Sequence, residues 1–162
     1  MSQSEHTSAT DRANSFPWPP VLVILAVAVA LGLNRVMPIS WPGLDDGPAH
    51  VIGIAIGTAG LILIASAITT LRRHNTTVMP DKTATTLVTS GPYHMFRNPI
   101  YLGEVMVMFG LAELTKNIWF VAAGILLALA VTWLQILPEE RHLEARFGND
   151  YLDYKQRTRR WI

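Results

Sequence analysis

Apolar residues occur in four long blocks, and the segments between the blocks are polar. The blocks cover about residues 18–34, 49–71, 99–114 and 118–137. A helix needs about 20 residues to cross the hydrocarbon core of a bilayer, so the second and fourth blocks are long enough, whereas the first and third are short. The pattern predicts an all-α integral membrane protein with four transmembrane helices over residues 18–137, preceded by a polar segment, 1–17, and followed by a helical tail, 138–162.

The first block also has a feature of signal peptides, because the sequence Ala28-Val29-Ala30 resembles a cleavage site. The region before it lacks positive character, since Glu5 and Asp11 accompany Arg12, and it contains three prolines. A signal peptide begins with a basic segment, so we expect a retained helix.

The order of blocks and charges predicts an orientation. Only residues 114–117 separate the third and fourth blocks, which indicates an antiparallel helical hairpin. Ten of the thirteen Lys and Arg residues lie in two segments: Arg72, Arg73, Lys82 and Arg97, and six in the tail from Arg141 to Arg160. Cytoplasmic loops are enriched in Lys and Arg. We therefore expect a plasma or inner membrane protein whose middle loop, tail and two termini face the cytoplasm.

Gly53 and Gly57 in the second block match the small-xxx-small pattern that lets membrane helices approach closely. The surrounding run, GIAIGTAG, has no strand before it and no acidic residue at the spacing of a nucleotide-binding loop. It predicts helix packing rather than a phosphate site.

Composition agrees with a membrane location. The chain is 50% hydrophobic and 15% charged, whereas soluble domains carry about 25% charged residues. It contains no cysteine, which excludes disulfides, thiolate nucleophiles and cysteine-ligated metals in this sequence.

Two polar segments carry the candidate chemistry. The first ends in SGPYHMFRNPIYLGE, residues 90–104, where Ser90-Gly91-Pro92 predicts a turn and Pro99 predicts the start of a helix. The second is the tail, PEERHLEARFGNDYLDYKQRTRRWI, which has the spacing of an amphipathic helix interrupted near Gly148.

Each of these features also has an interpretation without chemistry. The tail could be an interfacial helix whose basic residues meet anionic lipid. Arg97 could extend its charged end to water, and Tyr93 and Tyr101 could belong to the aromatic belt of a membrane protein. Glu139 and Glu140 could be solvated charges at the end of a helix.

The combination favours a binding site. Glu104 lies six residues into the third block and should face protein or a wet cavity, with Arg97 or a tail arginine as a conceivable partner. The hairpin should bring Arg97 and its tyrosine neighbours close to Glu139 and Glu140. Arginine, glutamate and aromatic faces together suit a zwitterionic small molecule with a flat ring.

The two segments resemble the isoprenylcysteine carboxyl methyltransferase family, to which the phospholipid N-methyltransferases are related. The family pattern is roughly G-x-Y-x-x-x-R-H-P-x-Y-x-G, a membrane hairpin, and then E-E-x-x-L-x-x-x-F-G-x-x-Y-x-x-Y. The resemblance covers residues 87–162. It departs from the family at Asn98, where histidine is common, and asparagine cannot titrate near neutral pH. A proton-transfer role at that position is therefore in doubt, whereas a role in holding the cofactor is compatible with asparagine.

The resemblance implies an S-adenosylmethionine-dependent methyltransferase, with the cofactor at the cytoplasmic face and a lipophilic acceptor reached from the bilayer. The matching positions are Tyr93, Arg97, Asn98, Tyr101 and Gly103 in the first motif, and Glu139, Glu140, Leu143, Phe147, Gly148, Tyr151 and Tyr154 in the second.

Within this set we expect catalytic roles for Arg97, Glu140 and Glu104. Arg97 would orient an acidic group of the acceptor, Glu140 would contact the ammonium group of the cofactor, and Glu104 would line the passage of the acceptor. Cofactor contacts are expected from Tyr93, Asn98, Tyr101, Glu139, Glu140, Tyr151 and Tyr154. No metal ligand is expected, and the expected partners are the bilayer and a methyl acceptor (a carboxylate, amine or thiol) rather than nucleic acid.

Two other functions remain open from the sequence. Sterol reductases resemble this family in their membrane core and use NADPH, although they usually carry more spans. A non-catalytic membrane scaffold or sensor would also retain the helices, and the absence of the family histidine is compatible with it.

Overall fold

A computed structural model describes residues 18–39, 41, 47–75 and 86–162, and every regular element in those ranges is helical. The helices are α1 (Trp18–Val36), α2 (Gly47–Arg73), α3 (Pro99–Thr115), α4 (Trp119–Val131), α5 (Leu137–Phe147) and α6 (Asn149–Arg157), with a 3₁₀ helix, η1 (Gly91–His94), and a π-helical turn, η2 (Thr132–Ile136). The all-α prediction is confirmed for these residues, and the four apolar blocks coincide with α1, α2, α3 and the α4–η2 helix. The predicted polar segment 1–17 lies outside the described residues.

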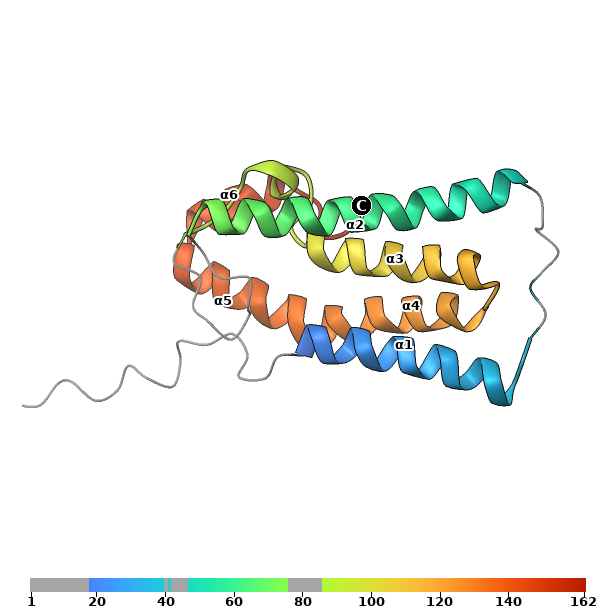
Figure 1. The fold of residues 1–162 in the computed structure, drawn as a ribbon. Helices are drawn as coiled ribbons and strands as arrows, with labels where there is room; N and C mark the ends of the chain where they lie inside the picture. Colours follow the sequence, from blue (N-terminus) through green and yellow to red (C-terminus); the bar gives the residue numbers. More distant parts are fainter. Residues whose placement is uncertain (1–17, 40, 42–46, 76–85) are drawn as a thin grey trace, which may run out of the picture.

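The long helices lie side by side in the order α2, α3, α4, α1, and α5, α6 and η1 gather at one end of this layer (Figure 1). The predicted hairpin is present: α3 ends at Thr115, and Lys116 turns the chain in the left-handed region with φ 51° before α4 starts at Trp119. Both polar segments therefore lie at the same end of the bundle.

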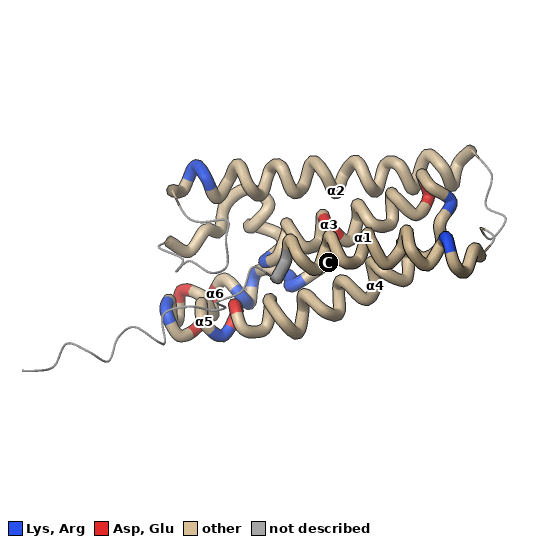
Figure 2. The backbone as a smooth tube through the Cα atoms, turned by 60° about the horizontal axis from the view of Figure 1, so that its bottom comes forward, with Lys and Arg blue, Asp and Glu red and all other residues tan. Residues whose placement is uncertain are grey.

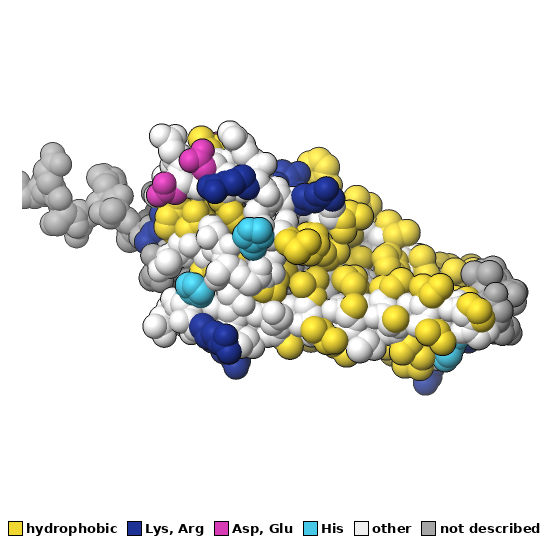
Figure 3. Space-filling model, turned by 90° about the horizontal axis from the view of Figure 1, so that it is seen from above, with side chains coloured by type: hydrophobic (Ala, Val, Ile, Leu, Met, Phe, Trp, Pro, Cys, Tyr) yellow, Lys and Arg dark blue, Asp and Glu magenta, His cyan; other side chains and the backbone are white. Residues whose placement is uncertain are grey.

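Apolar side chains cover the body of the molecule. Two helices, Gly47–Arg73 and Trp119–Phe147, are long and apolar enough to cross a membrane, and Pro20–Val36 is a shorter apolar helix. On the face that Figure 3 draws, hydrophobic side chains extend along the bundle from the end with most of the Lys and Arg toward the opposite end, where basic and His side chains also appear. Charged residues concentrate around α5 and α6, with a few at the opposite end (Figure 2). The number of spans stays a prediction, because α3 has only 17 residues.

Helices α2 and α3 approach closely along a line of glycines. A Cβ atom on Gly57 would lie 2.9 Å from the Cα of Gly110, and one on Gly60 would lie 2.6 Å from the carbonyl oxygen of Gly103. Gly53 also faces α3, so the close packing predicted from Gly53 and Gly57 is confirmed. Helices in lipid associate mainly through such van der Waals contact. Gly103, a position of the first motif, is thus required for packing.

The helix that starts at Trp119 continues through Pro138, which is the predicted boundary between the last membrane helix and the tail. Proline lacks a backbone N–H and crowds the carbonyl four residues earlier, which usually breaks a helix. The π-helical turn just before it widens the helix, and the N–H of Leu137 donates to the carbonyl of Thr132. Glu139 and Glu140 therefore stand on a helical extension of α4.

We expect Gly110→Ala to lower stability by roughly 1–3 kcal/mol, because the added methyl group would have to displace the backbone of α2. The measurement is thermal unfolding in detergent. Gly32→Ala is the matched control, since nothing lies within 4 Å of a Cβ at Gly32 and alanine favours a helix. A Gly110→Ala protein as stable as the Gly32→Ala protein would contradict the close contact.

Candidate active site

The segment before α3 and the C-terminal segment are joined by backbone hydrogen bonds. The N–H of Arg97 donates to the carbonyl of Arg159 at 2.8 Å, and the N–H of Arg159 donates to the carbonyl of Met95 at 3.0 Å. Phe96 and Arg159 form a parallel β-bridge. The chain end is thereby held against the residues that begin the first motif.

Arg97 lies inside this junction, with only 10% of its side chain exposed. Its Nε donates to Oε1 of Glu140 at 3.2 Å, and its Nη1 donates to the carbonyls of Lys155 at 2.9 Å and Thr158 at 2.6 Å. The interpretation of Arg97 as a residue that extends its charge to water is wrong, because the guanidinium group is buried among protein acceptors. The contact also confirms that the hairpin brings Arg97 to Glu140.

Glu140 is the most completely paired carboxylate of the site, and its side chain is 7% exposed. Arg160 binds it with two parallel contacts: Nε donates to Oε1 at 3.0 Å and Nη2 donates to Oε2 at 2.7 Å. This forked geometry is the strong form of an arginine–carboxylate pair. Hydrogen bonding to Glu140 raises the pKa of Arg160. Glu140 is therefore a buried ion-pair partner of two arginines and not a solvated charge.

Asn98 is buried and stands at the N-cap position of α3, but its side chain does not cap the helix. Its Nδ2 donates instead to the carbonyl of Arg160 at 3.0 Å. An amide makes this contact at any pH, because it does not titrate. The asparagine at this motif position thus helps to hold the C-terminal segment.

The tyrosines of α6 pack under the first motif. The hydroxyl of Tyr154 donates to the carbonyl of Tyr93 at 2.7 Å, and the rings of Tyr151 and Tyr154 are 6.1 Å apart between centroids. Burial raises the pKa of Tyr154 to about 12 and also raises the pKa values of Tyr93 and Tyr151. All three tyrosines therefore stay neutral at physiological pH.

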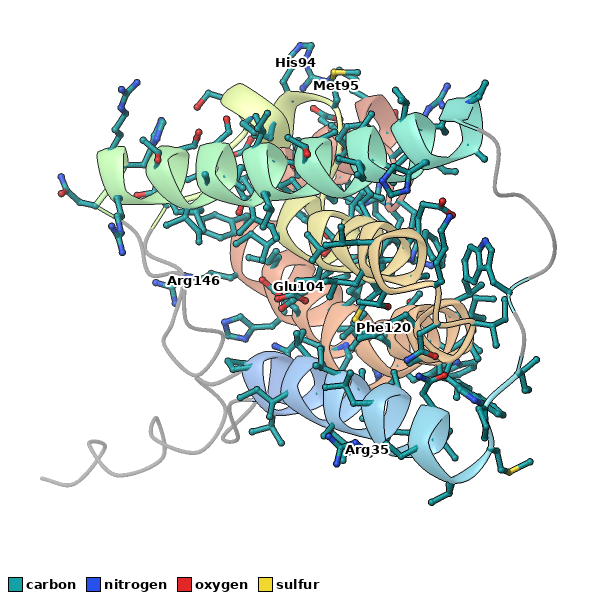
Figure 4. The ribbon with its side chains drawn as sticks, turned by 45° about the vertical axis from the view of Figure 1, so that its right-hand side comes forward. Arg35, His94, Met95, Glu104, Phe120 and Arg146 are labelled. Atoms are coloured by element: carbon teal, nitrogen blue, oxygen red, sulfur yellow. The ribbon has the colours of Figure 1, made fainter. Side chains whose placement is uncertain are left out.

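Glu104 lies apart from the cluster around Glu140, deeper in the bundle. Figure 4 shows it pointing from α3 into the interior, whereas His94 and Met95 project outward from the polar end. Its Oε2 atom is buried, and no group in the described residues donates a hydrogen bond to it. Tyr101 lies three residues before Glu104 on α3, so the two side chains lie on the same face of that helix. Among the described residues, Glu104 has neither Arg97 nor a tail arginine as an ion-pair partner; Arg97 pairs with Glu140.

A pocket of about 580 Å³ opens beside the cluster at the polar end. Its walls come from the segment before η1, from η1 itself and from α5 and α6, and they include Leu87, His94, Phe147, Asp150, Tyr154 and Thr158. Tyr154 and Thr158 also contact the first motif, so the pocket and the ion-pair cluster share a wall. A volume of this size suits a small organic ligand.

Sequence reasoning missed Arg160. The sequence shows the tail arginines as a basic segment, and a basic segment does not distinguish Arg160 from the exposed Arg159 beside it. One available signal was that two adjacent carboxylates, Glu139 and Glu140, follow an apolar helix and need compensation if they are buried.

The sequence is similar to a known family and to several known proteins. The sequence model of the phospholipid methyltransferase family matches residues 48–150. The nickel-cobalt-cadmium resistance protein NccN of Alcaligenes xylosoxydans xylosoxydans is 33% identical over 141 residues, which are 87% of this chain and 60% of that protein. The cobalt-zinc-cadmium resistance protein CzcN of Cupriavidus metallidurans is 27% identical over 146 residues, 87% of this chain and 59% of that protein. An uncharacterized protein of Haemophilus influenzae is 45% identical over 63 residues, which are 39% of this chain and all of that protein.

This chain therefore spans about three-fifths of the length of the two metal-resistance relatives. In the described part of the chain, no group of three or more His, Cys, Asp or Glu side chains is placed to hold a metal ion.

We expect Arg97→Ala to destabilise the junction by roughly 3–5 kcal/mol, because it removes one partner of a buried ion pair and two donors to carbonyls. Amide hydrogen exchange in residues 149–162 should accelerate. Arg72→Ala, at the exposed end of α2, is the control and should leave that exchange unchanged. Equal exchange in both variants would contradict the structural role of Arg97.

Proposed function

Because the chain belongs to the phospholipid methyltransferase family, we propose that it is an integral-membrane enzyme that transfers a methyl group from S-adenosylmethionine to a lipophilic acceptor. The family assignment agrees with the resemblance to the isoprenylcysteine carboxyl methyltransferases. The observation that carries the proposal is the cluster of Arg97 and Arg160 around the buried Glu140, which joins the two motifs at the polar end of an apolar bundle.

Glu140 suits the ammonium group of the cofactor because its carboxylate already accepts cationic donors in a buried site. Glu139 is the preceding residue on α5. We assign Tyr93 and Tyr101 to the adenosine part, and Asn98, Tyr151 and Tyr154 to the framework that shapes the site. The adjacent pocket has the volume of a small-molecule site, and Tyr154 is the residue of this set that lines it.

The sequence predicts that Arg97 orients an acidic group of the acceptor, but its hydrogen bonds in the structure are made within the protein. Three of its hydrogen bonds are made to Glu140 and to the carbonyls of Lys155 and Thr158. We propose that Arg97 holds Glu140 and the C-terminal segment in place, and that it orients an acidic group of the acceptor only through its remaining donors.

The sulfonium of the cofactor supplies an electrophilic methyl group, so the protein has to align the acceptor and exclude water. We propose that Tyr101 and Glu104 line the path by which the acceptor arrives from the bilayer. An acceptor carboxylate needs no base. For an amine or a thiol, the candidate to receive the proton is Oε2 of Glu104, which accepts no hydrogen bond from the described residues.

We further propose that α1, α2, α3 and α4 all cross the membrane, with the site on the cytoplasmic side. Support comes from the concentration of Lys and Arg around the end that carries α5 and α6 (Figure 2). It also comes from the apolar surface that extends along the bundle (Figure 3).

The purified protein in detergent should bind S-adenosylmethionine and S-adenosylhomocysteine with micromolar affinity by calorimetry. Glu140→Gln should weaken binding at least tenfold, because it removes the charge that faces the ammonium group. Glu144→Gln is the matched control: it removes the same charge from the same helix, and the Glu144 side chain is 43% exposed and pairs with Lys155 at 3.2 Å.

Absence of binding to a folded sample would overturn the methyltransferase proposal. Binding of NADPH instead would favour a reductase, and binding of neither cofactor would favour a scaffold.

Reporter fusions test the proposed topology. A phosphatase that is active only outside the cytoplasm should be active after Val36 and Thr115, and inactive after Arg73 and Ile162. A fusion after Thr115 that behaves like one after Arg73 would show that α3 does not cross the membrane.

A further inference from the structure

Glu140 carries one negative charge and is paired with two cations, Arg97 and Arg160. Arg160 contributes two contacts, at 3.0 and 2.7 Å, and Arg97 contributes a third at 3.2 Å. Only 7% of the Glu140 side chain is exposed, so the space around its oxygens is taken up by these two guanidinium groups. A third cation cannot reach the carboxylate at hydrogen-bond distance while both arginines stay in place.

The two arginines are held differently. Arg97 is 10% exposed and is tied to two backbone carbonyls in addition to Glu140. The Arg160 side chain is 38% exposed, and its described side-chain hydrogen bonds are both with Glu140. Arg160 is therefore the cation that can leave.

The backbone at Arg160 is held without help from its side chain. Asn98 donates to the carbonyl of Arg160, and the neighbouring Arg159 pairs with Met95 and Arg97 through its backbone. The guanidinium group can thus turn into solvent while the C-terminal segment keeps its position. Arg97 would remain beside Glu140, so the buried carboxylate would not be left without a counter-charge.

We propose that Arg160 occupies, in the cofactor-free protein, the place at Glu140 that the ammonium group of the cofactor takes, so that cofactor binding exchanges one cation for the other. This inference rests on the proposed function. Because the binding-competent arrangement is the one with Arg160 displaced, the pairing lowers the apparent affinity for any ligand that brings an ammonium group. A ligand without that group does not compete with Arg160.

A purely supporting role for Arg160 makes the opposite prediction. If Arg160 only orients Glu140 toward the cofactor, removing its charge should weaken binding of the cofactor, as a substitution of Glu140 does. The sign of the change in affinity therefore separates the two roles.

The test compares Arg160→Gln with Arg159→Gln, which removes the same charge from the adjacent exposed side chain. The ligands are S-adenosylhomocysteine and its deaminated analogue, in which a hydroxyl group replaces the ammonium group. Arg160→Gln should strengthen binding of S-adenosylhomocysteine at least fivefold relative to Arg159→Gln, and should change binding of the analogue less than twofold. Arg160→Lys, which keeps the charge but loses the fork, should fall between wild type and Arg160→Gln.

Phenylglyoxal modification gives a second measurement on the unaltered protein. S-adenosylhomocysteine should increase modification of Arg160 at least twofold, with Arg159 as the internal reference, and the deaminated analogue should not.

Weaker binding of S-adenosylhomocysteine by Arg160→Gln, or equal effects on both ligands, would overturn the exchange and leave the proposed function standing. If no folded variant and no wild-type protein binds S-adenosylhomocysteine, the proposed function fails, and this inference fails with it.

Discussion

The buried carboxylate of Glu140 is the constraint on which the polar end of the molecule depends. An ionised carboxylate inside a protein is costly unless cations and hydrogen bonds compensate it. Arg97 provides compensation from the beginning of α3, and Arg160 provides it from the end of the chain. Three segments that are far apart in the sequence are therefore fixed relative to one another by one charge.

The packing of the helices determines where Glu140 and Arg97 lie. The π-helical turn at Thr132–Ile136 lets the α4 helix pass through Pro138, so Glu140 stands on a rigid extension of the bundle. The glycine line between α2 and α3 sets how closely those helices pack and hence where Arg97 emerges. The position of Arg97 thus depends on the close packing of the α2 and α3 backbones at Gly57, Gly60, Gly103 and Gly110.

Glu140 and Glu104 lie in opposite environments. Glu140 has two arginines at the polar end, whereas Glu104 lies deeper in the bundle and has a buried oxygen without a described hydrogen-bond donor. This contrast suits an enzyme that holds a polar cofactor at the membrane surface and receives a lipophilic acceptor from the bilayer. Tyr93 belongs to the polar end, where its carbonyl accepts a hydrogen bond from Tyr154, and Tyr101 shares a face of α3 with Glu104.

Local features of this protein were predictable from its sequence. The long apolar helices follow from the length of the apolar blocks. The start of α3 at Pro99, the break at Gly148 and the glycine face of α2 follow from the properties of proline and glycine. The motifs also indicated the family and the meeting of Arg97 with Glu140. Each of these depends on neighbours in the chain or on a short hairpin.

The tertiary structure alone decided which charges are buried and with what partners. In the sequence, Arg159 and Arg160 are equivalent members of a basic tail, and Glu104 and Glu140 are both carboxylates near helix ends. The fold buries Glu140 between two arginines, exposes Arg159 and leaves Glu104 without a cationic partner among the described residues. These outcomes depend on how the returning C-terminal segment packs against the first motif, and residues so distant in sequence leave no local pattern that specifies such packing.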